Sequence, residues 1–351
     1  MAYTTINKSS DYFKTLLYTG NGSNAHSITG VGFKPDFVWT KNRGSSTDHY
    51  IHDIVRGVEK AIRTNVTTGT YDTSINLQSF DSDGFTVGTQ DGLNKSGKDI
   101  VSWNWLAGGN SGSSNTDGSI TSTVSANTTS GFSVVKWTGS GGNATIGTGL
   151  NAVPKMIIVK SLANTTSWMV YHSAIGNNSE IYLNGTNAAA GSSTAWQDTD
   201  PTSSVFYVAG GAGDGVNASG DYVAYCFAEK KGFSKFGSYT GNGNADGPFL
   251  YCGFKPAMIF LKNASDGAKN WEILDHRRPS SGQNPADDIL FPDTSDSESH
   301  SQTDRLVDFL SNGVKIRGNS GQMNGSGNNF IFACFAEAPL VGSNNVPANA
   351  R

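Results

Sequence analysis

Short apolar runs bounded by turn residues recur along the chain, and they predict β-strands rather than helices. The runs "FVW" from Phe37, "MIIV" from Met156 and "MIFL" from Met258 each begin two residues after a proline and end close to a lysine. Such runs are typical of a central strand that is covered on both faces of a sheet. The best helical candidate is "VRGVEKAIRTN" from Val55, and it predicts one short helix at most.

These runs belong to a pattern that the chain contains three times. An aromatic residue is followed by T-G-x-G, twelve further residues and P-x-[FM]-[VI]-x-x-K, starting at Tyr18, Trp137 and Tyr239. Each copy also ends on N-x-S-G before an apolar strand, and the copies begin 119 and 102 residues apart. This spacing is about the size of an independent domain and exceeds the unit of a solenoid or propeller. The sequence therefore predicts tandem domains.

The predicted fold class is all-β, with three tandem antiparallel β-sandwich domains. The expected parts are an N-terminal arm (1–10), repeat domains (11–109, 131–230 and 231–340), a linker (110–130) and a C-terminal tail (341–351). The linker is rich in Gly, Ser, Thr and Asn, a composition that favours flexibility. We therefore expect the first domain to move more freely than the closely joined second and third.

Individual residues of the pattern have expected structural roles. Gly20 and its counterparts are expected at tight turns, where a positive φ costs glycine little, and the prolines are expected to start strands. The dipeptides Asp83-Gly84 and Asn312-Gly313 predict turns between paired strands. The lysine that ends the apolar run after each proline is expected to place its charge in water. These lysines are Lys41, Lys160 and Lys262.

Composition argues against several classes of function. The formal net charge is −4, and no basic cluster exists beyond Arg277-Arg278, so nucleic-acid binding is not predicted. No segment approaches the roughly 20 apolar residues that a membrane helix requires. Lys8, Asp11 and Lys14 interrupt the segment where a signal peptide needs an apolar core. We expect synthesis in a cytoplasm without a signal peptide, and no membrane insertion.

The cysteines and glycines do not indicate a cofactor or a covalent framework. The chain has three cysteines, and Cys226 and Cys334 occupy matching places in the last strands of the second and third copies. This equivalence predicts small buried residues rather than disulfides. The glycines are spread as turns and are not clustered before a helix, so no cofactor is predicted.

Catalysis is not predicted either. Glycosidases place two carboxylates around one glycosidic bond, whereas no two of the six glutamates lie near each other in the sequence. The histidines of "HYIHD", His49 and His52, should point to opposite faces of a strand. "DSDGF" from Asp81 lacks the further ligands of a calcium loop. No metal site is predicted.

Two places remain as candidate binding sites. Trp196, in the loop "STAWQDTDP", is expected to be exposed and would offer a sugar a flat apolar face. The acidic insertion "DDILFPDTSDSESHSQTD" occurs only in the third copy and is either a solvated loop or a cation or partner site. Its candidate residues are Asp287, Asp288, Asp293 and Asp296.

Several phrases of the first copy resemble a known family. "MAYTTINKSSDYFKTLLYTGNG", "GFKPDFVWTKNR", "FDSDGFTVG" and "SGKDIVSWNWLAGG" resemble a concanavalin A-like lectin/glucanase domain of unassigned activity found in virion proteins of marine bacteriophages of the cyanophage and pelagiphage kind. The resemblance covers the first copy from about Asp11 to Gly109, and the other copies only at their landmarks. It implies a jelly-roll fold and a place on a phage particle, and it supplies no catalytic residues.

The expected function is therefore that of a non-enzymatic bacteriophage virion protein on the particle surface. It would serve as a capsid fibre or decoration, or as a tail appendage, in assembly or host attachment. Its expected partners are other capsid or tail proteins, with a host surface glycan as a further candidate, and a homo-oligomer is expected, with a trimer favoured for a fibre. The alternatives are a carbohydrate-binding adhesin and, least favoured, a glycan depolymerase.

Overall fold

Short strands joined by tight turns account for nearly all regular structure in the computed structural model, which describes residues 3–191, 194–210, 215–279 and 282–341. The described chain forms six antiparallel sheets. Its helical elements are a four-residue helix, α1 (Asp91–Asn94), and a 3-10 turn, η1 (Ser9–Asp11). The prediction of an all-β protein is therefore confirmed.

The helix predicted from Val55 is wrong. Residues Lys60–Arg63 form strand β5 instead. Gly57 and Glu59 have φ values of 89° and 63°, in the left-handed region. A right-handed helix cannot continue through this backbone, so the segment turns and then extends.

The three copies of the sequence pattern build three large sheets with the same strand order. In each copy the first strand pairs with the last, the last with the strand that follows or contains the proline, and that strand with the next one along the chain. In the first copy the order is β1 (Phe13–Thr19), β9 (Asp99–Trp105), β3 (Phe37–Asn42), β4 (Tyr50–Asp53), β5 and β6 (Tyr71–Asp72). In the second it is β12 (Phe132–Gly139), β19 (Gly220–Ala228), β14 (Pro154–Ser161), β15 (Met169–His172), β16 (Ser179–Tyr182) and β17 (Ala190–Gly191). In the third it is β20 (Ser234–Thr240), β26 (Asn329–Pro339), β22 (Phe254–Asn263) and β23 (Trp271–Asp275).

A smaller sheet accompanies each large one. The small sheets are β2 (His26–Thr29), β8 (Gly84–Val87) and β7 (Leu77–Asp81); β13 (Ala144–Gly147) and β18 (Val205–Val208); and β21 (Phe249–Tyr251), β25 (Gly313–Ile316) and β24 (Val307–Leu310). Asp81 pairs with Gly84 and Leu310 pairs with Gly313, so tight turns join these hairpins. The predicted turns between paired strands are confirmed, one residue earlier than expected, because Ser82-Asp83 and Ser311-Asn312 form the loops and each glycine begins the next strand.

The segment expected to be a flexible linker is part of a sheet. Within residues 110–130, strands β10 (Ser113–Asn115) and β11 (Ser122–Asn127) extend the large sheet of the second copy through β12. The backbone hydrogen bonds of these strands satisfy groups that composition alone suggested were solvated. From here, repeat 1 denotes residues 11–109, repeat 2 residues 110–230 and repeat 3 residues 231–340.

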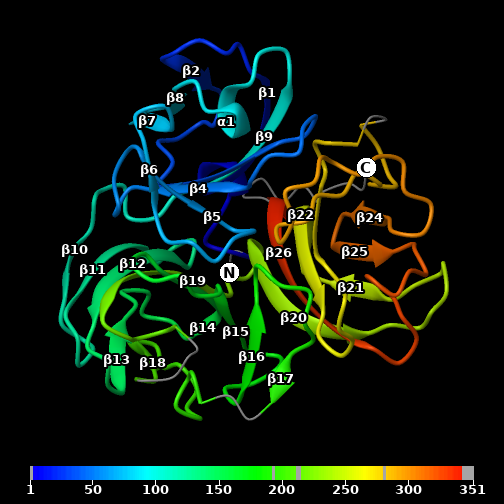
Figure 1. Cartoon of the computed structure of the whole chain (residues 1–351). Helices are drawn as coiled ribbons and strands as arrows, with labels where there is room; N and C mark the ends of the chain where they lie inside the picture. Colours follow the sequence, from blue (N-terminus) through cyan, green and yellow to red (C-terminus); the bar gives the residue numbers. More distant parts are fainter. Residues whose placement is uncertain (1–2, 192–193, 211–214, 280–281, 342–351) are drawn as a thin grey trace.

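The three repeats surround a common centre (Figure 1), with repeat 1 in blue and cyan, repeat 2 in green and repeat 3 in yellow to red. The large sheets meet there through one equivalent residue of each last strand, namely Trp105, Phe227 and Phe335. The ring centroids of these residues lie 6.2, 5.2 and 5.6 Å apart, so each ring contacts both others. Their positions correspond because their strand partners are Phe37, Met156 and Met258.

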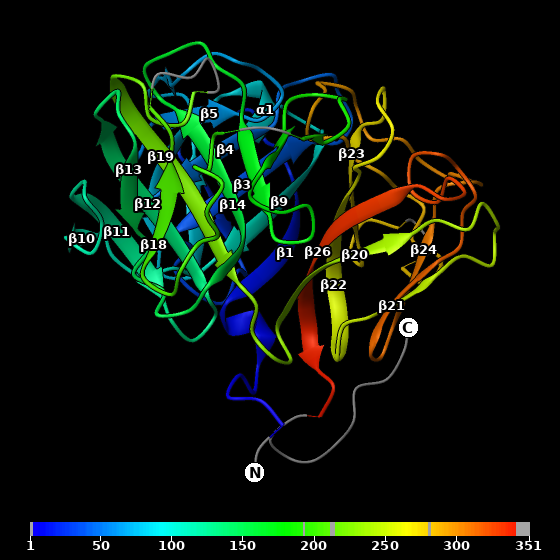
Figure 2. The same ribbon diagram turned by 90° about the horizontal axis from the view of Figure 1, so that it is seen from below.

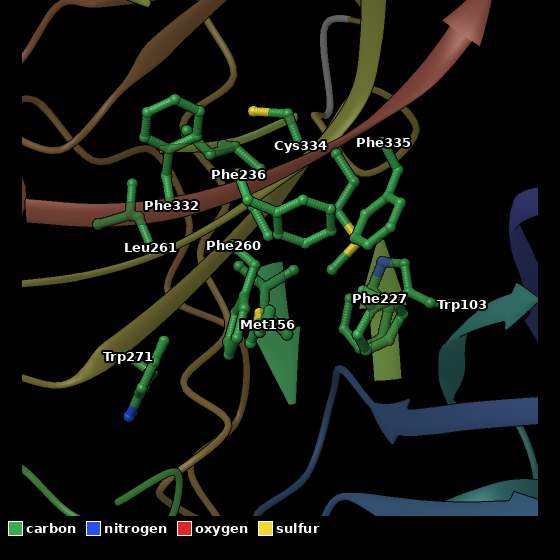
Figure 3. Packing of buried hydrophobic residues seen from close by; sticks show 14 of the residues in the cluster. Trp103, Met156, Phe227, Phe236, Phe260, Leu261, Trp271, Phe332, Cys334 and Phe335 are labelled. Carbon is green, nitrogen blue, oxygen red and sulfur yellow. The ribbon is translucent and has the colours of Figure 1, made fainter. Parts of the chain in front are cut away.

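Side chains from all three repeats fill this centre. Figure 3 shows Phe227, Phe335, Met156 and Phe260 converging from different strands, and the space left between the three faces is about 20 Å³. Aromatic rings of this size dominate the apolar surface that a core buries. The repeats therefore share one hydrophobic core, and repeats 1 and 2 each have a further core cluster of their own.

The N-terminal arm lies against repeat 3 and continues into repeat 1. The Tyr3 hydroxyl donates to the Gly253 carbonyl (2.5 Å), and the Thr4 hydroxyl donates to the Lys231 carbonyl (2.6 Å). Ile6 is 1% exposed and belongs to the shared core. Figure 2 shows this segment running beside the end of β26. The arm thus closes the ring of repeats, and the expectation of a freely moving first domain is wrong.

The two landmarks of the sequence pattern lie against each other in every repeat. In repeat 1 the Gly22 amide donates to the Asn94 carbonyl (2.8 Å), and the Gly97 amide donates to the Gly20 carbonyl (2.8 Å). The corresponding amides of Gly141 and Gly243 donate to the carbonyls of Asn217 and Asn324, each at 2.9 Å. The recurrence of the two landmarks is therefore explained by one structural junction built three times.

The first glycine of the pattern is required by space, not by a positive φ. A Cβ on Gly20 would lie 2.3 Å from the Lys95 carbonyl oxygen, and its counterparts at Gly139 and Gly241 would meet carbonyls at 2.0 and 2.2 Å. The left-handed backbone belongs to the second glycine instead, with φ values of 70° at Gly22, 75° at Gly141 and 67° at Gly243.

Candidate functional site

The lysine at the end of the sequence pattern is buried in every repeat, so the expectation that it reaches water is wrong. Lys41, Lys160 and Lys262 are each 0% exposed. Each ammonium group donates to a carbonyl of a neighbouring repeat. The acceptors are Ser295 for Lys41 (3.1 Å), Thr67 for Lys160 (2.8 Å) and Thr186 for Lys262 (3.1 Å). Repeat 1 thus bonds to repeat 3, repeat 2 to repeat 1 and repeat 3 to repeat 2, in one rotational sense.

Each of these lysines also holds the loop that follows its own strand. The acceptors are the carbonyls of Thr47 (2.6 Å), Thr166 (2.8 Å) and Lys269. Burial lowers the pKa of all three ammonium groups to about 8. A buried charge is tolerated only where hydrogen bonds replace its hydration, and the two sets of carbonyls supply them. The lysines act as bridges between repeats.

The strand after each lysine ends at a second contact between repeats. In repeat 1, Asp53 at the end of β4 accepts hydrogen bonds from Arg56 Nε (2.5 Å) and from the Tyr225 hydroxyl of repeat 2 (2.7 Å). Arg56 further donates to the Ile51 carbonyl (3.0 Å). Burial lowers the pKa of the Arg56 guanidinium, but the adjacent Asp53 carboxylate raises it by more. The pKa of Arg56 is therefore raised.

The same contact recurs between the other repeats. Asp275 at the end of β23 accepts from Arg278 Nε (2.6 Å) and from Trp103 Nε1 of repeat 1 (2.9 Å). Burial alone would raise the pKa of Asp275, but Arg278 lowers it below the usual range. In repeat 2 the position is occupied by His172, whose Nε2 lies 3.2 Å from the Phe332 carbonyl of repeat 3. The contacts therefore close a ring through all three repeats.

The acidic insertion of repeat 3 docks on repeat 1. Glu298 is 5% exposed, and its Oε2 accepts from Arg43 Nε (2.7 Å) of repeat 1. Its Oε1 accepts from Arg278 Nη1 (2.6 Å). Asp288 is 2% exposed and lies 3.1 Å from His300 Nδ1 through its Oδ1. The insertion is therefore more than a solvated loop, because Glu298 joins it to a neighbouring repeat of the same chain.

The other three candidate aspartates have different contacts from those of Asp288. Asp293 accepts from the Trp271 amide (3.1 Å) and from Asn270 Nδ2 (3.0 Å), and burial raises its pKa to about 7. Burial and the neighbouring Asp288 also raise the pKa of Asp287. Asp296 is exposed. The four aspartates therefore do not share one set of contacts.

One group in the described part of the chain has ligand atoms close enough for a metal ion. Asp288, Glu298 and His300 each place such an atom within 4.8 Å of the others. Both oxygens of Glu298 already accept from Arg43 and Arg278. A cation would have to displace these guanidinium groups, so the cluster is better suited to joining repeats than to binding a metal.

Trp196 is not exposed, so the expectation of a sugar platform at this ring is wrong. The residue is 2% exposed, and its ring lies edge-on to Tyr171, 5.7 Å between centroids. Gln197 and Asp198 have φ values of 55° and 48°, and the side-chain Nε2 of Gln197 donates to the Ala144 and Val208 carbonyls. This turn directs the tryptophan into the core of repeat 2, and no residue type in the loop indicated it.

The side chains of the HYIHD and DSDGF motifs take part in the packing and the turns of repeat 1. His49 and His52 are both 0% exposed, and Trp39 Nε1 donates to His49 Nδ1 (3.1 Å). Burial lowers the pKa of His52 to about 3, so this side chain is neutral. The Asp83 carboxylate accepts from the amides of Gly30 (3.1 Å) and Gly32 (2.6 Å), which fixes the turn.

An open cleft of about 350 Å³ lies between repeats 1 and 2. One ion pair from each repeat lines it, Lys60 with Asp72 (3.5 Å) and Lys136 with Asp221 (2.9 Å). Leu162 adds an apolar surface. Charges of both signs from two repeats therefore line this cleft.

These features define an all-β protein of interlocked sequence repeats, in which buried polar groups bond from one repeat to the next. The chain belongs to the family described as a domain of unknown function, DUF7483, whose model matches residues 8–339. The match spans all three repeats as one unit. No curated protein and no solved structure matches the chain. No helix among the described residues has the length and apolar character to cross a membrane.

Proposed function

We propose that this protein is a non-enzymatic structural protein of a bacteriophage, with three concanavalin A-like jelly-roll units displayed on the virion surface. It would form a capsid fibre or decoration, or part of a tail appendage, and serve assembly or host attachment. The resemblance of repeat 1 to phage virion domains motivates the proposal. The observation that carries it is the closed ring of contacts between repeats.

The ring supports a structural role because it uses the charged groups of the chain for internal cohesion. Lys160 and its two counterparts, Asp53 and Asp275 all bind a neighbouring repeat. Such bonds resist separation of the repeats, since breaking one leaves a buried polar group without a partner. Resistance of this kind suits a protein that must stay folded on the outside of a particle.

Imaging of purified particles tests this proposal. Gold-labelled antibody raised against the chain should decorate intact virions, and mass spectrometry of particles purified through a density gradient should find the protein at a fixed ratio to the capsid protein. Label over the shell would indicate a decoration or head fibre, and label at the tail would indicate a host-recognition part. Protein found only in the lysate would overturn the proposal.

A second candidate, the carbohydrate-binding adhesin, is favoured by the cleft between repeats 1 and 2. Asp72 and Asp221 offer acceptors, Lys60 and Lys136 offer donors, and sugars present both kinds of group in their hydroxyls. The D72N/D221N double variant should weaken binding to host surface polysaccharide by at least tenfold. Equal binding of this variant and the natural chain would count against the cleft, and no binding by either would count against an adhesin.

A further inference from the structure

The sandwich of repeat 3 has an open edge. Its large sheet ends at β20 and its small sheet ends at β21, and neither strand pairs with a second strand among the described residues. Ser234 and Lys235 of β20 and Tyr251 of β21 line one surface cleft of about 570 Å³. The two free strands therefore lie on the same side of the sandwich.

The chain itself closes the same edge in repeat 2. Strand β11 pairs antiparallel with β12, the counterpart of β20. Ile120 forms a bridge to Ile146 on β13, the counterpart of β21, and its amide donates to the Thr145 carbonyl (3.2 Å). Residues from 110–130 thus cover both strands. The fold therefore accepts an added strand at this edge.

The hydrogen bonds of β20 show which of its backbone groups face the open edge. The Gly241 amide donates to the Asn328 carbonyl (2.9 Å), and the Ala336 amide donates to the Phe233 carbonyl (2.8 Å). Residues that bond to one neighbouring strand alternate along an antiparallel strand, so the odd-numbered residues of β20 bond to β26. The N–H and C=O groups of the even-numbered residues point toward the open edge.

Part of this edge is capped and part of it is free. The Phe236 amide donates to Glu229 Oε2 (3.2 Å). Ser238 is exposed, and among the described residues its amide has no hydrogen-bond partner. Its counterpart in repeat 2, Lys136, is paired with Thr123 of β11. The position that a strand covers in repeat 2 is thus free at Ser238.

Two exposed aromatic residues lie beside the open edge. Phe249 is 44% exposed and Tyr251 is 58% exposed, more than any other large hydrophobic residue that the structure describes. Both lie on β21, on the face opposite to the buried Leu250.

The fold does not require aromatic residues at these two positions. The strand registers align them with Ser27 and Thr29 in repeat 1 and with Thr145 and Gly147 in repeat 2. Small residues therefore serve the same strand in the other repeats. Exposed apolar side chains that the fold does not need are typical of a contact surface.

We propose that the open edge of repeat 3 is the contact between two copies of this chain, in which β20 of one copy pairs antiparallel with β20 of the other. Phe249 and Tyr251 then become buried beside the new strand pair. A second copy fits this edge because it presents the same free N–H and C=O groups, and a two-fold axis brings identical strands together antiparallel. The inference is independent of the proposed virion function.

A two-fold axis beside Ser238 uses the free groups of both copies. The Ser238 N–H of each copy would donate to the Ser238 C=O of the other, and the Thr240 N–H would donate to the Phe236 C=O. The Thr240 C=O would take over the Phe236 N–H from Glu229, whose Oε1 is already paired with Lys235 (2.9 Å). Because this edge carries charges of both signs, identical edges do not meet as like charges.

Sedimentation equilibrium of the full chain tests the association. We expect a monomer–dimer equilibrium, and S238P should raise its dissociation constant at least tenfold because proline removes the central donor. The single chain should tolerate this proline, since it lies on an edge strand with its N–H facing solvent.

The aromatic pair is tested with the residues that repeat 1 has in the same register. The F249S/Y251T double variant should also raise the dissociation constant at least tenfold. V58S is the control, because Val58 is 41% exposed on repeat 1, away from this edge. It should leave the dissociation constant unchanged.

Amide hydrogen exchange locates the contact on the natural chain. Peptides of β20 should exchange more slowly above the dissociation constant than below it. Peptides of β1, which ends the large sheet of repeat 1, should exchange equally at both concentrations. This measurement decides the matter even if a variant fails to fold.

Several outcomes would overturn the proposal. The natural chain could stay monomeric at every concentration that its solubility allows, or form a dimer or trimer whose protected segments lie outside β20. A dimer that S238P and F249S/Y251T leave unchanged would contradict the contact equally. A chain that stays monomeric and binds host polysaccharide through Phe249 and Tyr251 would assign the aromatic pair to a glycan instead.

Discussion

At Gly20 the backbone of the N-x-S-G landmark leaves no room for a side chain. The Cβ of Gly20→Ala would lie 2.3 Å from the Lys95 carbonyl oxygen, an atom that cannot rotate away. We expect this variant to lower the free energy of unfolding by about 2 kcal/mol or more, the range in which overpacking and backbone strain fall. Chemical denaturation measures the change.

Gly142→Ala is the matched control for this substitution. A Cβ at Gly142 meets no atom within 4 Å, and its φ is not in the left-handed region. Its effect should stay within about 0.5 kcal/mol. Equal effects of the two variants would contradict the steric explanation of the repeated T-G-x-G.

Glu272 should make the stability of repeat 3 depend on pH. The side chain is fully buried on β23, and Arg305 Nη1 lies 3.5 Å from Oε1, too far to replace its hydration. Burial raises its pKa from 4.5 to about 7. The folded state therefore holds the proton more tightly than the unfolded state, and this contribution is complete below pH 4.5 and is lost as the pH rises through 7.

The Glu272→Gln variant removes this dependence. Relative to the variant, the natural chain should lose on the order of 3 kcal/mol between pH 4.5 and 7. Denaturant titrations of both proteins across this range measure the difference. A difference that is constant with pH would contradict the assignment of a buried, protonated carboxyl.

Single residues show which features of the structure the sequence predicts and which it does not. Cys226 and Cys334 were correctly expected to be buried, because their positions repeat in a core strand. Trp196 was expected in solvent, but two left-handed residues after it turn its ring inward. Local sequence does not reveal such a turn, since neither Gln nor Asp requires this backbone.

At the scale of strands, substitution of a bridging lysine tests how the repeats are held together. The Lys160→Met variant keeps most of the apolar stem but removes the lysine donor from the Thr166 carbonyl and from the Thr67 carbonyl, which still accepts from the Thr166 amide. An unsatisfied buried group costs about 1 to 3 kcal/mol, so we expect a loss of that size in unfolding free energy. Equilibrium denaturation is the measurement.

Lys136→Met provides the comparison in the same repeat. Lys136 pairs with Asp221 at 2.9 Å, with more than a third of each side chain exposed. Exposed ion pairs contribute about 0 to 1 kcal/mol, so this change should be small. A Lys160 variant that loses no more than the Lys136 variant would contradict the bridge.

The elements themselves were largely predictable, and their assembly was not. The strands after each proline and the hairpins at Asp83-Gly84 and Asn312-Gly313 follow from local pattern and turn chemistry. Residues 110–130 were assigned to a linker because Gly, Ser and Thr suit solvent, yet β10 and β11 gain their order from pairing with β12. Pairing between distant segments is invisible to composition.

At the scale of the whole molecule, the chain contains within itself a threefold arrangement of homologous units. The sequence suggested three separate domains because each copy has the length of one, but the inward faces carry rings such as Trp105 that only the other repeats can bury. The trimer expected for a fibre stays a prediction about assembly between chains. The ring of contacts concerns the single chain.

The central claim is that the three repeats fold as one cooperative body around a shared core. Scanning calorimetry of the full chain tests it most directly. We predict a single transition whose calorimetric and van't Hoff enthalpies agree, because removal of any repeat exposes the aromatic centre and breaks bonds to both neighbours. Two or three resolved transitions, each with the enthalpy of one repeat, would contradict the claim.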